Sequence, residues 1–327
     1  MNAARRAMRG IARTATTVGF TALLVWFVWL RRDDLRPVWE DPSWDLLVIG
    51  LLIAVSHFLN SLEFWVVYRA MGVGISAMEN WMVFTSGLLG NLLPGQVGTL
   101  YKFRYMNSVH GMEFSRNGSS YGANLVISLG SSSVVGIVGV VLHSVTGGRF
   151  AWTVLAAFIG LGVACLVVMN VPLPAHKVLR GRLARAGRTF SDGWDEIRRN
   201  PSTAVTVAII DVGKYAFTAW RFHLAFGLLG VHESYWFFLV IAPAAAIAGI
   251  IAFTPGGLGF RELFVTVAAV GMGSGFDTGL LAATTDRGVM LISALVLGAG
   301  GYVYTVPRMR RARTTQPTPN VPRANGR

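Results

Sequence analysis

The feature that most constrains the fold is a broken segment at residues 250–263, which separates two apolar runs. Pro255 cannot donate a backbone hydrogen bond and obstructs a continuous helix. Three nearby glycines allow backbone angles that other residues resist. In hydrocarbon, such a break is tolerated only where protein or a wet cavity surrounds it. Arg261 and Glu262 follow at once, and ionisable groups at membrane depth mark a candidate functional site.

A second break with the same spacing occurs earlier, at residues 91–104. Its proline and two of its glycines are Pro94, Gly95 and Gly98. They coincide, without a gap, with the proline, the first glycine and the third glycine of the later segment. Matched Pro/Gly interruptions in the two halves of a membrane chain point to the substrate site of a transporter.

The composition indicates that these apolar runs lie in a membrane. The chain has 327 residues, of which 53% are hydrophobic and only 14% charged, whereas a soluble domain carries about 25% charged residues. The apolar residues form long blocks, which predicts a polytopic membrane protein. The net charge of +13 fits cytoplasmic loops near anionic lipid, so no nucleic-acid partner is expected. The single cysteine, Cys165, excludes an internal disulfide.

The pattern predicts an all-α integral membrane bundle with six spanning helices and two hairpins of shorter helices. The spans are expected at residues 14–30, 46–68, 119–145, 151–171, 202–229 and 280–306, and the hairpins at 81–93 with 99–109 and at 236–253 with 260–272. Several of the short pieces fall below the roughly 20 residues that a full crossing needs. Whether each piece re-enters or crosses stays open, which allows six to eight crossings.

Positive charges set the orientation. Arginines gather near the N-terminus, in the loop 172–201 and in the tail 307–327, so all three are expected on the cytoplasmic side of the cell inner (plasma) membrane. The membrane domain, 1–306, then divides into halves at about 14–145 and 151–306. Each half has three spans, an odd number, so the halves are predicted to be inverted repeats. The tail is expected to be disordered.

Residues 255–262 read Pro-Gly-Gly-Leu-Gly-Phe-Arg-Glu. This run resembles the Pro-Gly-Gly-Leu-Gly-x-x-Glu signature of the lysylphosphatidylglycerol synthase transmembrane-domain family, the flippase half of the multiple peptide resistance factors. The earlier Pro-Gly break resembles the looser first motif of that family. Arg287 resembles an arginine that the family often places in the helix after the second motif.

The sequence departs from this family pattern at two places. Thr99 stands where an acidic residue is expected, and Asn124 with Leu125 stands where a Glu-Arg pair is expected in the third helix. The sequence contains no sizeable globular segment for aminoacyl transfer. The resemblance therefore implies a stand-alone member that translocates lipid rather than aminoacylating it.

Further ionisable residues lie inside the apolar runs. Asp211, Lys214 and Arg221 fall near one face of the fifth helix. In the second helix, three residues follow one another at three-residue spacing along one face: His57, Asn60 and Glu63. A lone charge at mid-membrane costs at least roughly 2.5–3.5 kcal/mol, so these faces should look into protein or water. A buried pair that only fixes packing is the alternative.

Other charges lie near predicted helix ends. Lys102 and Arg104 are placed to attract a lipid phosphate at the cytoplasmic mouth, or to snorkel to the interface. Asp286 and Arg287 are expected to pair locally, and Glu262 to orient Arg261 or to act as a proton or counter-ion site. The residues expected to contact substrate are Pro94, Gly95, Gly98, Lys102, Arg104, Asp211, Lys214, Pro255, Gly256, Gly257, Gly259, Arg261, Glu262 and Arg287.

Together these features favour a lipid flippase-like protein that moves an anionic phospholipid or a lipid-linked intermediate between leaflets. Membrane phospholipid is the expected partner, and neither enzymatic activity, a cofactor nor a metal is expected. One alternative is a membrane-embedded lipid-phosphate glycosyltransferase, which would use an acidic pair in a loop, such as Asp33–Asp34, Glu40–Asp41 or Asp195–Glu196. The other is an accessory subunit of a cell-envelope lipid or glycan synthase, bound to an envelope-synthesis enzyme.

Overall fold

The computed structural model describes residues 44–92, 97–170, 197–251 and 259–315, together with Trp29, Trp194 and Asp195. These parts consist of helices joined by short turns, and they contain no strand. The predicted all-α fold is therefore confirmed. Apart from Trp29, the expected first span at 14–30 lies outside the described residues, as do most of the basic loop and residues 316–327.

The described helices follow the predicted order. They are α3 (Trp44–Ala70), α4 (Ala77–Asn91), α5 (Val97–His110), α6 (Phe114–Val145), α7 (Trp152–Asn170), α10 (Pro201–Gly227), α11 (Tyr235–Ile251), α12 (Phe260–Gly271) and α13 (Phe276–Thr315). Local signals explain several of the ends. Ser76 caps α4 by accepting a hydrogen bond from the backbone of Glu79, and α10 begins with Asn200 as its cap and Pro201 in its first turn.

The last helix differs from the expectation. It continues to Thr315, so residues 307–315 are helical and are not part of an irregular tail. Pro307 lies within the helix, although proline usually ends one. Side-chain contacts hold the turn beyond it: the Arg308 guanidinium lies 3.8 Å from the ring centroid of Tyr304, and Met309 is buried.

The helices have the lengths and surfaces of a membrane protein. In the described part of the chain, α3, α6, α7 and α13 are long and apolar enough to cross a membrane. α10 has the same 27-residue length as α3, about 40 Å at 1.5 Å per residue, but it carries charged residues. α7 exposes apolar side chains such as Val163, Leu166 and Val167, which suits contact with lipid.

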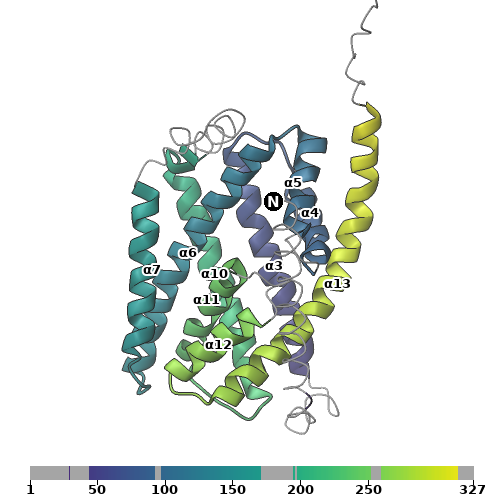
Figure 1. Cartoon of the computed structure of the whole chain (residues 1–327). Coiled ribbons are helices and arrows are strands. Elements are labelled where there is room, and N and C mark those ends of the chain that lie inside the picture. The colour runs from purple at the N-terminus through teal and green to yellow at the C-terminus, as the bar shows by residue number, and fades with distance from the viewer. Residues whose placement is uncertain are drawn as a thin grey trace, which may run out of the picture.

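The two hairpins enter from opposite ends. In Figure 1, α4 and α5 lie in the upper part of the molecule, whereas α11 and α12 lie in the lower part. α3 runs upward and α10 runs downward beside it, and α6 and α13 likewise run in opposite directions. Among the described helices, α3 and α6 of the first half therefore have oppositely directed counterparts in α10 and α13 of the second, as expected for inverted repeats.

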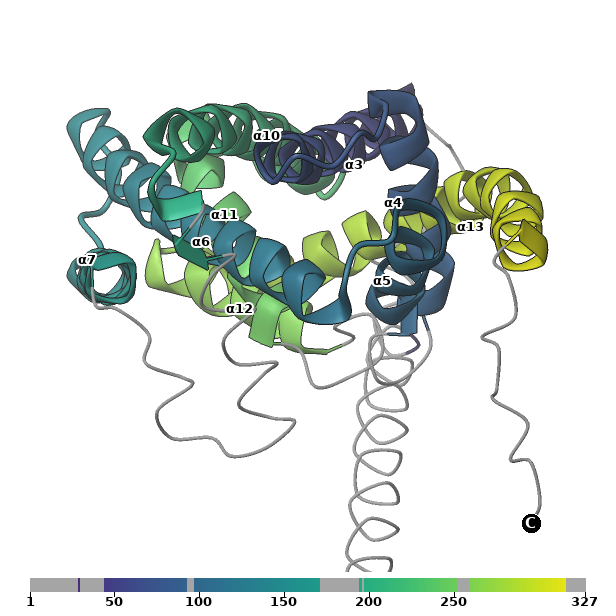
Figure 2. The same cartoon turned by 90° about the horizontal axis from the view of Figure 1, so that it is seen from above.

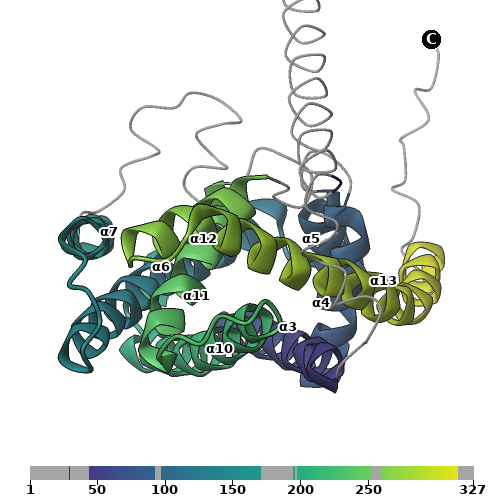
Figure 3. The same cartoon turned by 90° about the horizontal axis from the view of Figure 1, so that it is seen from below.

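The two halves interlock through their hairpins. α13, from the second half, packs on α4 of the first hairpin, and α6, from the first half, packs on α11 of the second. Small residues permit both contacts: a Cβ on Gly301 would lie 2.4 Å from Thr85 Oγ1, and one on Gly139 would lie 2.9 Å from Val240 Cγ2. Figures 2 and 3 show α7 at one side of the bundle and the end of α13 at the other.

The apolar interior follows the same division. One buried cluster surrounds the second hairpin and draws on α6, α10, α11, α12 and α13. The other surrounds the first hairpin and draws mainly on α3, α4, α5 and α6. The helices on either side of each break therefore pack within an apolar cluster.

Candidate functional site

The second hairpin resumes as a helix at Gly259. Its φ of +82° lies in the left-handed region that glycine adopts without strain. The Gly259 N–H donates a hydrogen bond of 2.7 Å to Oε2 of Glu262, so the first turn of α12 is closed by its own carboxylate. The break itself, which includes Pro255, Gly256 and Gly257, lies outside the described residues.

Arg261 and Glu262 are both buried, and both pair with residues of α13. Nη1 of Arg261 lies 2.8 Å from Oδ2 of Asp286 on α13. Oδ1 of the same carboxylate lies 2.5 Å from Nε of Arg221 on α10. Nε of Arg287 lies 3.8 Å from Oε1 of Glu262. This arginine cluster, defined as these five residues, joins α12 to α10 and α13.

Both acidic residues have ion-pair partners on other helices. The oxygens of Asp286 lie beside Arg221 and Arg261 rather than beside the expected local partner Arg287, and Glu262 lies beside Arg287, where it can serve as a counter-ion. The reason is geometric: consecutive residues on a helix point about 100° apart and do not face each other. Here neighbouring helices supply the partners.

A second cluster lies further along α10. Nζ of Lys214 lies 2.6 Å from Oε1 of Glu63 on α3 and also forms an ion pair with Asp211. The Ser128 hydroxyl contacts Oδ1 and Oδ2 of Asp211 at 3.1 and 2.9 Å, and Asn124 donates to Oε2 of Glu63 at 3.3 Å. This lysine cluster thus includes Asn124, one of the positions at which the sequence departs from the family pattern.

The two clusters differ in formal charge. With every group ionised, two carboxylates and one ammonium give the lysine cluster −1, and three guanidinium groups and two carboxylates give the arginine cluster +1. Lys214 and Arg221 are two turns apart on α10, or about 10 Å along its axis. The structure thus places Asp211 and Lys214 in one cluster and Arg261, Glu262 and Arg287 in the next.

The first hairpin has a different character. Gly98 is buried where α4 and α5 meet, and a Cβ there would lie 1.8 Å from the Gly87 carbonyl oxygen. Its role in the structure is therefore close helix packing. Pro94 and Gly95 lie outside the described residues. The two basic residues of α5 separate: Arg104 is exposed, whereas Lys102 is half-buried.

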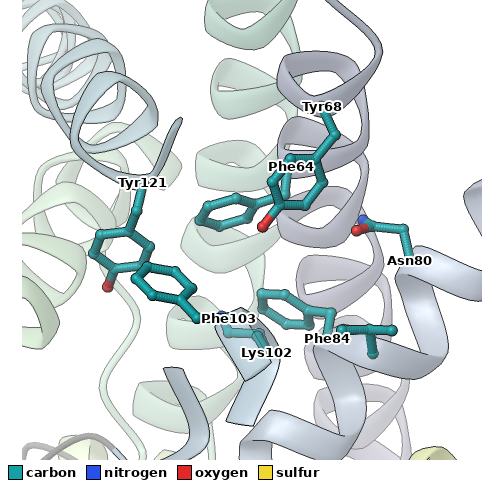
Figure 4. Close-up of a pocket in the computed structure, with 8 residues that line it drawn as sticks. Phe64, Tyr68, Asn80, Phe84, Lys102, Phe103 and Tyr121 are labelled. Carbon is teal, nitrogen blue, oxygen red and sulfur yellow. The ribbon is translucent and has the colours of Figure 1, made fainter. Parts of the chain in front are cut away.

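Lys102 reaches into a pocket between α3, α4, α5 and α6. Its Nζ lies 4.8 Å from the ring centroid of Phe84, 5.1 Å from that of Phe64 and 6.0 Å from that of Tyr121. Figure 4 shows the lysine beside Phe103 and Phe84, with the other rings around the same space. The residues that line this aromatic pocket are Phe64, Tyr68, Asn80, Val83, Phe84, Lys102, Phe103 and Tyr121.

Sequence reasoning left several of these residues out of the expected site. Glu63, Arg221 and Asp286 carry a detectable signal, because each is an ionisable residue within an apolar helix. The aromatic residues around Lys102 carry none, because Phe and Tyr are common in apolar runs. Only the packing of four helices gathers them around one ammonium group.

Apolar spans with ion-paired charges in the interior define a polytopic helical membrane protein. The model of the family described as lysylphosphatidylglycerol synthase TM region matches residues 13–298. The chain belongs to this family, as its Pro-Gly-Gly-Leu-Gly motif suggested. The family indicates a membrane protein with a lipid-related role. No curated protein matches the chain.

Proposed function

We propose that this protein moves an anionic phospholipid, or a lipid-linked intermediate, from one leaflet of the membrane to the other. One observation carries the proposal. The helix that follows the Gly-rich break begins with Arg261 and Glu262, and both are ion-paired inside the protein to α13. Ionisable groups beside a broken membrane helix are characteristic of transport sites.

The arginine cluster supplies the chemistry. Three guanidinium groups lie there beside two carboxylates, so the cluster is formally cationic. A phosphodiester that approaches along the break can exchange with a carboxylate as a partner of arginine, because both accept the same forked hydrogen bonds. The head group would pass between the hairpin tips while the acyl chains stay in lipid.

The inverted hairpins supply the path. They enter from opposite ends of the bundle (Figure 1), so each can serve one leaflet. On this proposal the protein is a transporter and not an enzyme, and it needs no cofactor. It lies in the plasma membrane with both termini in the cytoplasm, as the positive-inside pattern favours.

The test is lipid translocation by purified protein in liposomes. A fluorescent phospholipid is placed in both leaflets, and a membrane-impermeant quencher reports the outer pool. Wild-type protein should make the protected inner pool accessible over time. Glu262→Gln, which removes a charge from the arginine cluster, should slow this exchange, whereas Glu113→Gln, at the exposed start of α6, should not.

The lipid panel must include anionic and zwitterionic head groups and an extract of native membranes. If no lipid moves faster than in empty liposomes, the translocation proposal fails, and copurification of a stoichiometric synthase would then favour the accessory-subunit alternative. Of the acidic pairs that a glycosyltransferase would use, only Asp195 lies within the described residues. The described structure therefore adds nothing to that alternative.

A further inference from the structure

The aromatic pocket beside the first hairpin holds a positive charge without a carboxylate. Lys102 is the charged residue among those that line it, and no acidic side chain in the described parts of the chain lies within ion-pair distance of its ammonium group. The rings of Phe64, Phe84 and Tyr121 face that group instead. Ring faces stabilise a cation only weakly compared with a carboxylate.

Other buried cations of the described helices do have a carboxylate partner, unlike Lys102. Lys214, Arg221 and Arg261 each have a carboxylate within ion-pair distance. Glu63 directly precedes the pocket residue Phe64, yet its two oxygens contact Lys214 and Asn124. The fold therefore gives each of these three cations a carboxylate partner, whereas the Lys102 ammonium faces aromatic rings.

We propose that this aromatic pocket binds the phosphate of an anionic membrane lipid, with the Lys102 ammonium as its counter-ion. The inference rests on the proposed translocation and specifies a docking site for the substrate at the first hairpin. The ammonium is a compact donor suited to phosphate. The surrounding rings offer apolar faces to the glycerol and the upper acyl chain, and no lining carboxylate repels the phosphate.

The same geometry predicts head-group selectivity. A zwitterionic lipid would bring a second cation close to Lys102, and the lining contains no carboxylate to receive it. The pocket should therefore prefer phosphatidylglycerol to phosphatidylcholine. It should also prefer the lipid to glycerol 3-phosphate, because the soluble anion leaves the aromatic faces without an apolar partner.

The experiment measures binding separately from transport. Purified protein in neutral detergent is unfolded thermally in the presence of increasing phosphatidylglycerol, phosphatidylcholine or glycerol 3-phosphate. A ligand that binds the folded state raises the unfolding temperature with concentration. Phosphatidylglycerol should give the largest rise for the wild type. Lys102→Met should weaken this binding by about tenfold, the effect of losing one charge-assisted contact.

Two variants control for charge and folding. Arg310→Met removes an exposed positive charge from α13, away from the pocket lining, and should leave the phosphatidylglycerol response unchanged. Lys102→Arg keeps the charge and should keep most of the response. If Lys102→Met does not fold, Lys102→Gln is measured in its place. Without lipid, the Met variant should be at least as stable as the wild type, because the substitution removes an unneutralised cation.

Several results would overturn the proposal. They are an equal phosphatidylglycerol response in the wild type and Lys102→Met, an equal response to phosphatidylcholine, and a full response to glycerol 3-phosphate. A Lys102→Met protein that is much less stable without lipid would assign the lysine a packing role instead. Lys102-dependent binding by a protein that moves no lipid in liposomes would support the pocket and refute the translocation proposal alone.

Discussion

Replacing Asp286 by asparagine should be strongly destabilising, because this carboxylate serves two arginines at once. It is fully buried, and its oxygens lie 2.5 Å from Nε of Arg221 and 2.8 Å from Nη1 of Arg261. Asparagine keeps the volume but removes the negative charge. Arginine does not lose its proton in proteins, so both guanidinium groups would stay charged and without this counter-ion.

The magnitude follows from the pair geometry. Two unit charges about 4 Å apart attract by about 4 kcal/mol at an effective dielectric constant of 20. Removing one partner of a buried pair costs about 3–5 kcal/mol in measured cases. We therefore expect Asp286→Asn to lower the free energy of unfolding by about 4 kcal/mol. At about 2 °C for each kcal/mol, the unfolding temperature should fall by on the order of 6–10 °C.

The assay is thermal unfolding of the purified variants in one detergent, with Glu113→Gln as the control for loss of an exposed carboxylate. The control should change the stability by no more than about 0.5 kcal/mol. A double-mutant cycle with Arg221→Gln tests the mechanism: the second change should cost at least about 1 kcal/mol less in the Asp286→Asn background. Additive effects, or an Asp286→Asn protein as stable as the control, would refute the ion-pair argument.

Two further predictions concern packing and topology. Gly301→Ala should destabilise by about 1–3 kcal/mol, because its Cβ would meet α4 at 2.4 Å, whereas Gly300→Ala, which meets nothing within 4 Å, should be neutral or stabilising in the same thermal assay. In a Cys165→Ser background, an impermeant thiol reagent applied to intact cells should label Thr146→Cys and not Glu113→Cys, because these residues lie at opposite ends of α6. The reverse labelling would contradict the assigned orientation.

The sequence by itself determined the class of the molecule and the order of its elements. Apolar blocks, the two spaced Pro-Gly breaks and the arginine distribution were enough for an all-helical membrane bundle with two short-helix hairpins. The reason is that hydrocarbon leaves few ways to satisfy a backbone. Pro307 is the local exception: a helix-breaking residue suggested an irregular tail, yet contacts by Arg308 and Met309 accompany a helix that continues to Thr315.

The tertiary structure alone decided which charge pairs with which. Asp286 and Arg287 are neighbours in sequence, so one-dimensional reasoning paired them, but adjacent helical residues point in different directions. Their partners come from α10 and α12. The pocket around Lys102 likewise combines residues from four helices. Side-chain partners at this distance in sequence depend on how helices cross, and helix crossing is fixed by packing between elements rather than by any local run of residues.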